Sequence, residues 1–135
     1  MKIIILQGRG GVGKTTTLNK VFDELAGPLG YRPAGLRRQL GGDPLDFSEI
    51  LDGHCKIGIF TMGDYGTPLV EATDDFEQQG CAVMICACNN RVRTQVRLSD
   101  KWANYPSETV FKTEDRDYQQ AANQQDMRRI IGLIK

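Results

Sequence analysis

Eight consecutive residues near the N-terminus carry the most specific chemical pattern in the chain. The stretch GRGGVGKT, residues 8–15, fits the phosphate-binding pattern G-x-x-x-x-G-K-[ST] at every defined position. Such a loop turns backbone N–H groups inward around an anion, which requires conformations that glycine adopts at little cost. We expect Lys14 to reach the β- and γ-phosphate oxygens of a nucleotide and the Thr15 hydroxyl to bind the bridging Mg²⁺. The expected nucleotide-binding residues are Gly8, Arg9, Gly10, Gly11, Val12, Gly13, Lys14, Thr15 and Thr16.

This pattern requires a strand before it and a helix after it. Residues 2–7 form an almost unbroken apolar run, which predicts a fully buried parallel strand. Residues 14–26 carry apolar side chains on one helical face and are followed by Gly27 and Pro28, which predicts a helix that ends there. A bound anion would then lie at the first turn of this helix, where unpaired N–H groups and the helix dipole favour negative charge.

The rest of the chain alternates between strand-like and helix-like segments. Arginines interrupt the apolar pattern of residues 31–40, which predicts at most an edge strand. Asp52–Gly53 separates two extended runs and predicts an antiparallel hairpin. The other expected elements are strands at 57–62, 81–87 and 109–113 and helices at 67–80, 94–103 and 118–134. A chain of 135 residues with this alternation predicts one domain, residues 1–135. Its expected fold is an α/β three-layer sandwich with a mostly parallel sheet and an inserted hairpin.

Three aspartates lie where ligands bind in such sheets, after the carboxyl ends of strands. We expect the strand at 57–62 to lie beside the first strand, so that Asp64 supports Mg²⁺. The alternative is that Asp64 is a turn residue within 62–66. Asp43 and Asp46 precede the hairpin and are candidates to orient or deprotonate an acceptor hydroxyl. The alternative for this pair is turn and helix-cap chemistry.

Arginines follow the strand at 81–87. Arg91, Arg93 and Arg97 are candidates to neutralise charge on a transferred phosphoryl group. Because Arg93 and Arg97 are one helical turn apart, a solvated basic face is the alternative. The single histidine, His54, flanks the hairpin turn without an identifiable partner and is interpreted as structural or exposed.

Composition limits the classes of partner. The chain has 17 acidic and 17 basic residues, so no overall field attracts nucleic acid or anionic lipid, and we expect no nucleic-acid partner. The cysteines Cys55, Cys81, Cys86 and Cys88 have no zinc or redox spacing. They predict buried free thiols in a reducing compartment, with a metal-bound pair as the alternative. No apolar run is long enough for a signal or membrane segment, so we expect a cytoplasmic protein without membrane association.

Residues 8–15 resemble the Walker A motif of the P-loop NTPase superfamily. The stretch RGGVGKTTT, residues 9–17, is similar to the deviant loop K-G-G-x-G-K-[ST] of the MinD, ParA and nitrogenase-iron-protein group, with Arg9 in place of its signature lysine. Gly42–Asp43–Pro44 is also similar to the Asp-Pro of that group. The remainder resembles small P-loop kinases, with one compact domain, an acid after the second strand and arginines after a later strand.

The resemblance implies an ATP-binding protein that hydrolyses ATP or transfers its γ-phosphoryl group to a small acceptor with Mg²⁺ as cofactor. Residues 89–92 lack the Lys and Asp of an N-K-x-D guanine signature, so ATP is expected in preference to GTP. One alternative is a MinD/ParA-like switch that binds a protein partner or forms a homodimer. Another is a nucleotide-binding protein without turnover.

Overall fold

The part of the chain that the structure describes, residues 1–97 and 100–134, contains seven strands in one mixed sheet. The structure is a computed structural model, and it describes no side chain between residues 95 and 101. The strands are β1 (Lys2–Gln7), β2 (Arg32–Pro33), β3 (Arg38–Gln39), β4 (Phe47–Asp52), β5 (Lys56–Phe60), β6 (Val83–Cys88) and β7 (Ser107–Phe111). Their order is β2-β4-β5-β6-β1-β7, and β3 also pairs with β4.

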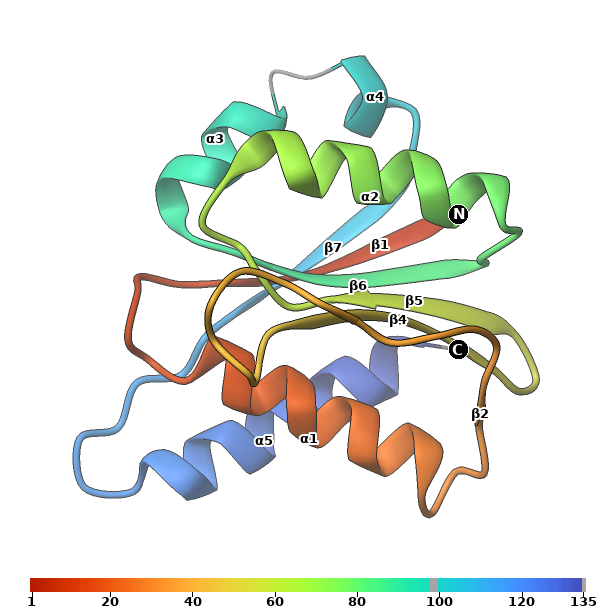
Figure 1. Ribbon diagram of the computed structural model, residues 1–135. Coiled ribbons are helices and arrows are strands. Elements are labelled where there is room, and N and C mark those ends of the chain that lie inside the picture. The colour runs from red at the N-terminus through yellow and green to blue at the C-terminus, as the bar shows by residue number, and fades with distance from the viewer. Residues whose placement is uncertain (98–99, 135) are drawn as a thin grey trace.

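Helices lie on both faces of the sheet (Figure 1). They are α1 (Lys14–Ala26), α2 (Gly66–Gln78), α3 (Asn90–Arg97), α4 (Asp100–Ala103) and α5 (Gln119–Leu133). Helices α1 and α5 lie on one face, and α2 lies on the other face together with α3 and α4. The helix expected over 94–103 is described as α3 and α4, and residues 98–99 lie outside the described residues. None of the described helices is both long and apolar enough to span a membrane.

The sheet has a parallel part and an antiparallel part. Strands β5, β6, β1 and β7 are parallel neighbours. Strand β4 is antiparallel to β5, as the Asp52–Gly53 turn predicted, and β2 and β3 are antiparallel to β4. Strands β2 and β3 have two exposed residues each, in agreement with the expected edge. The α/β class is therefore present with a mixed sheet.

The predicted position of the strand after the hairpin was wrong. Strand β5 does not lie beside β1, because β6 lies between them and pairs with both. All six residues of β6 are buried, whereas β5 begins with the half-buried Lys56 and contains Gly58. The more apolar strand therefore occupies the centre of the sheet. Periodicity could not distinguish the two, because both segments are short apolar runs.

Side chains of β1 pack into both cores, which explains its unbroken apolar sequence. Ile4 and Leu6 belong to the core on the α1 and α5 face, while Ile3 and Ile5 belong to the core under α2. In that second core, Phe76 of α2 lies directly on Gly58, where an added Cβ would come 2.5 Å from the ring. Glycine therefore permits the close approach of α2 to the sheet.

We predict that Gly58→Ala destabilises the protein, because the new methyl group collides with the Phe76 ring. Overpacking of this kind costs about 1–3 kcal/mol, which urea unfolding would measure. The matched control is Gly132→Ala in α5, where an added Cβ meets no atom within 4 Å. This control should be neutral or stabilising by up to about 1 kcal/mol. Equal losses in both variants would contradict the proposed packing.

Candidate functional site

The loop between β1 and α1 has the backbone that its glycines suggest. Gly11 has φ +76° and Gly13 has φ +92°, in the left-handed region that side-chain-bearing residues avoid. Helix α1 begins at Lys14, and its N-cap residue, Gly13, supplies no side-chain hydrogen bond. N–H groups at the first turn therefore remain free to bind an anion.

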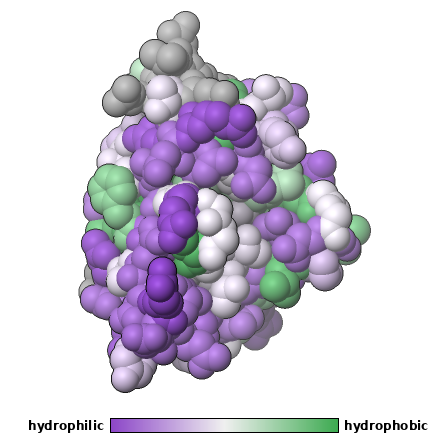
Figure 2. All heavy atoms as spheres, turned by 90° about the vertical axis from the view of Figure 1, so that its left-hand side faces the viewer, coloured by the Kyte–Doolittle hydropathy of each residue, from purple (hydrophilic) through white to green (hydrophobic). Residues whose placement is uncertain are grey.

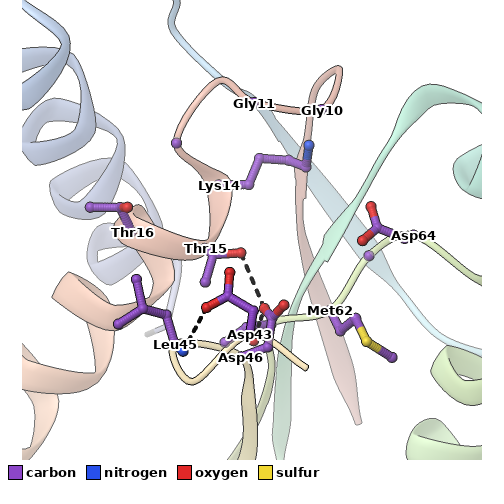
Figure 3. Close-up of a pocket in the computed structure, with 13 residues that line it drawn as sticks. Gly10, Gly11, Lys14, Thr15, Thr16, Asp43, Leu45, Asp46, Met62 and Asp64 are labelled. Atoms are coloured by element: carbon purple, nitrogen blue, oxygen red, sulfur yellow. Dashed lines mark hydrogen bonds between the residues drawn. The ribbon is translucent and has the colours of Figure 1, made fainter. Parts of the chain in front are cut away.

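Beside this loop lies a cavity of about 410 Å³, formed by three segments (Figure 3). They are the loop with the first turn of α1, the turn before β4, and the segment that follows β5. The lining residues are Gly10, Gly11, Gly13, Lys14, Thr15, Thr16, Asp43, Leu45, Asp46, Thr61, Met62, Gly63 and Asp64. The side of the molecule from which the loop projects is largely hydrophilic (Figure 2). Of the expected nucleotide-binding residues, Gly8, Arg9 and Val12 do not line the cavity.

Lys14 is the cation of the cavity wall. Its side chain is largely buried, and its ammonium donates to the carbonyl of Arg9 at 2.7 Å. Burial lowers the pKa of Lys14, and the Asp64 carboxylate opposes this shift. An anion bound in the cavity would compete with the carbonyl for the ammonium and would raise the pKa again.

Thr15 faces Asp46. The hydroxyls of Thr15 and Thr61 both donate to Asp46 Oδ1, at 3.1 and 2.7 Å. Thr61 Oγ1 also accepts the Phe47 N–H at 2.9 Å, which links the two strands of the hairpin. The sequence indicated Asp46 as a candidate to orient or deprotonate an acceptor hydroxyl, with a turn role as the alternative. It predicted neither the contact of Asp46 with Thr15 nor the part of Thr61. The hairpin register was the available signal, since it places the residues before β4 opposite those after β5.

Asp64 reaches the cavity although β5 is not adjacent to β1. The chain after β5 crosses the carboxyl end of β6, where the Asn89 N–H donates to the Gly63 carbonyl at 3.1 Å. A Cβ on Gly63 would lie 2.3 Å from the carbonyl oxygen of Ala87, so only glycine permits this crossing. Asp64 thereby lies on the opposite side of the cavity from Asp46 (Figure 3).

Asp43 has a turn role as well as a place in the cavity wall. Its Oδ1 accepts the Leu45 N–H at 2.9 Å, and its carbonyl accepts the Asp46 N–H at 3.1 Å. These bonds shape the turn that carries Asp46 toward Thr15. Asp43 is exposed and lines the cavity itself.

The arginines of α3 separate in space. Arg91 is exposed and donates to the Asp64 carbonyl at 3.3 Å, which places its guanidinium near the segment that carries Asp64. The guanidinium of Arg93 lies 5.8 Å from the centroid of the Trp102 ring, and Arg93 does not line the cavity. The side chain of Arg97 lies outside the described residues.

Arg9 turns to the segment after β7 instead of into the cavity. Its Nε and Nη2 lie 2.8 and 2.7 Å from Glu114 Oε1, and its side chain is 72% exposed. The hydrogen bond from Arg9 lowers the pKa of Glu114. In this structure the contact ties the loop to the segment that precedes α5.

A buried ion pair lies behind the loop and was not predicted. Lys112 and Asp126 are fully buried with Nζ and Oδ2 2.9 Å apart, and Asp126 also accepts the N–H and hydroxyl of Thr113. Burial raises the pKa of Asp126, but the Thr113 and Lys112 hydrogen bonds outweigh burial and lower it overall. A Cβ on Gly8 would lie 2.9 Å from Lys112 Cβ, so the loop rests against this pair.

Metal binding in the cavity would depend on few protein ligands. Among the described residues, no three His, Cys, Asp or Glu side chains form a group that could hold a metal ion. Thr15 and Asp46 are the residues that could support Mg²⁺, which usually keeps waters and takes phosphate oxygens as further ligands. The four cysteines are free thiols, three of them buried.

No protein-family model matches the chain, and no curated protein or solved structure matches it.

His54 lies outside the cavity, beside the hairpin turn at the other end of β4. It is exposed, and its Nδ1 lies 2.6 Å from the Tyr31 hydroxyl, a partner that the sequence did not reveal. The tyrosine is almost fully buried, so the contact closes the edge of the core near the turn.

We predict that Asp126→Asn destabilises the fold by about 3–5 kcal/mol, because it leaves the Lys112 ammonium buried without a counter-charge. Because the folded-state pKa of Asp126 is lowered, its contribution is complete above the unfolded-state pKa of about 4 and is lost as the pH falls through the folded value. Urea unfolding between pH 2 and 7 would measure both effects.

The control is Glu108→Gln, which removes the half-exposed partner of Lys2. It should cost less than about 1 kcal/mol. A loss in Asp126→Asn as small as in this control would contradict the role of the buried pair.

Proposed function

We propose that this chain is a P-loop protein that binds Mg²⁺ and ATP in the cavity and hydrolyses ATP or transfers its γ-phosphoryl group to a small acceptor. The observation that supports this proposal is the convergence of a glycine loop, Lys14, Thr15 and three aspartates on one cavity at the carboxyl ends of the strands. Ligands bind at that edge in open α/β sheets. A three-layer P-loop fold, with the parallel strands β5-β6-β1-β7 at its centre, accords with helices on both faces of the sheet.

The phosphates would lie against the loop and the first turn of α1. Lys14 would exchange the Arg9 carbonyl for phosphate oxygens. This exchange is favourable because the ammonium then pairs with a negatively charged acceptor instead of a neutral one. The Thr15 hydroxyl can bind Mg²⁺ through a lone pair and still donate its proton to Asp46. This geometry favours Asp46 over Asp64 as the carboxylate on the metal side. When bound, Mg²⁺ supplies charge neutralisation at the phosphates.

Asp64 then has a different role, on the opposite side of the cavity. In the proposed reaction a water or an acceptor hydroxyl attacks the γ-phosphorus, the bond to the bridging β–γ oxygen breaks, and ADP leaves. The Asp64 carboxylate would orient the attacking oxygen and receive its proton. Arg91, beside the Asp64 carbonyl, is the arginine positioned to offset developing charge, and Arg93 takes no part.

In this structure Arg9 pairs with Glu114 of its own chain. The dimerising switch stays a prediction. The preference for ATP over GTP stays a prediction from the missing guanine signature.

We predict that Lys14→Ala abolishes the thermal stabilisation of the protein by Mg·ATP, since the loop loses its phosphate-binding cation. A ligand present at about 100 times its Kd stabilises by about 2.7 kcal/mol, which a thermal shift would detect. Lys20→Ala is the matched control, on the same helix but outside the cavity lining. Equal ATP stabilisation of the two variants would refute the site.

We also predict that binding and turnover assays will distinguish the roles of Asp46 and Asp64. Asp46→Asn should weaken ATP binding when Mg²⁺ is present and leave binding in EDTA unchanged, because Asp46 acts through Thr15 and the metal. Asp64→Asn should retain Mg·ATP binding but lower ADP formation by about 10²–10⁴-fold. Calorimetry and steady-state ADP release, with and without a panel of hydroxylated acceptors, provide the measurements. Normal turnover in Asp64→Asn, or unchanged Mg²⁺ dependence in Asp46→Asn, would exclude the corresponding role.

A further inference from the structure

A second hollow lies between α2 and the edge of the sheet, away from the glycine loop. Two depressions of about 140 and 170 Å³ share Arg38, Ser48 and Asp75 in their walls and so form one groove. The floor is β4, on which Phe47 and Leu51 belong to the core of the α1 and α5 face. Since side chains alternate along a strand, Ser48 and Ile50 face the opposite side, toward α2.

Ser48 is the first observation that indicates a ligand. It is 8% exposed and makes no side-chain hydrogen bond within the part of the chain that the structure describes. Among these residues, every polar side-chain atom that is closed off from solvent has a hydrogen-bond partner. Because the Ser48 hydroxyl has none, it must be accessible from the groove that Ser48 lines. A polar group of a ligand in the groove could therefore hydrogen-bond to this hydroxyl in place of water.

Charged residues of both signs line the same depressions as this hydroxyl. Glu71 and Asp75 lie one turn apart on α2, and Arg38 contributes to the same walls. Neither Arg38 nor Glu71 forms an ion pair within the described residues, while Asp75 accepts a hydrogen bond from Gln79 at 2.9 Å. Opposite charges that share a groove without pairing leave space for a molecule that carries both complementary charges.

We infer that this groove binds a small zwitterion of the size and charge of a free amino acid. The ammonium group of the ligand lies against the carboxylates of Glu71 and Asp75, its carboxylate lies against Arg38, and the Ser48 hydroxyl completes the contacts. The two depressions are smaller than the roughly 300–1,000 Å³ of pockets for drug-sized ligands, as expected for such a molecule.

The groove is distinct from the glycine-loop cavity. Leu40 and Phe60 line the groove, while Met62 lines the cavity. All three belong to the core cluster under α2, and Met62 would lie 3.3 Å from a Cβ on Gly41. The groove and the cavity share no lining residue. The inference therefore does not rest on the proposed nucleotide chemistry.

The test is a ¹H–¹⁵N NMR titration of the whole chain with single free L-amino acids, and with ethanolamine and lactate as probes of one charge each. We expect at least one amino acid to give saturable shifts at Ser48 and Glu71, with binding at least 10-fold tighter than either single-charge probe. Failure of every amino acid to bind, or equal binding by ethanolamine or lactate, would overturn the inference.

Variants locate the binding. Ser48→Ala and Glu71→Gln should each weaken the amino-acid Kd by about 10-fold, as expected for a loss near 1.4 kcal/mol, and Asp23→Asn on the exposed side of α1 should not. Lys14→Ala should retain amino-acid binding and lose ATP binding, so the two proposals fail separately. Loss of amino-acid binding in Lys14→Ala, or its persistence in both groove variants, would assign the ligand elsewhere.

Discussion

Lys112 and Asp126 are buried directly behind the glycine loop, and the shape of the cavity depends on this pair. A buried charge is tolerated only when it is paired and hydrogen-bonded, and Asp126 has bonds from Lys112 and from both donors of Thr113. These bonds fix the end of β7 to α5. Gly8 rests on Lys112, and Gly13 rests on Asn123 of the same helix, so the loop is held from behind at both ends. A support of this kind holds the loop in place, which would lower the cost of binding the proposed nucleotide.

The cavity also depends on two excursions of the chain around the most buried strand. Strand β6 occupies the centre of the sheet, so the segment after β5 must cross its end to approach Lys14, and Gly63 permits this crossing. On the other side, hydrogen bonds across the β4–β5 hairpin hold Asp46 against Thr15. Asp46 and Asp64 thus reach the cavity from different directions, in keeping with the separate metal and proton-transfer roles proposed for them.

One edge segment links the cavity to the groove. Residues 34–45 have little regular structure, but Arg37 anchors them. Its guanidinium lies 3.9 Å from the Phe47 ring centroid and 4.6 Å from the Phe22 ring centroid, and it forms an ion pair with Glu49. This cation–π and ionic anchor holds Arg38 at the groove. The same segment continues into Asp43 and Asp46 at the cavity. Movement of this segment would therefore alter both sites.

The sequence alone determined the features that depend on local backbone preference. Glycines at Gly11 and Gly13, the apolar run of β1 and the Asp-Gly turn predicted the loop, a two-faced buried strand and the hairpin, because each is set by conformations or periodicity within a few residues. Tertiary structure decided which distant groups meet. The place of β6 beside β1, the Thr15–Asp46 contact and the pairing of Arg9 with Glu114 join residues from separate parts of the chain. Such contacts follow from how apolar faces pack, which no local pattern specifies, so the partners of the site residues could be found only in the folded chain.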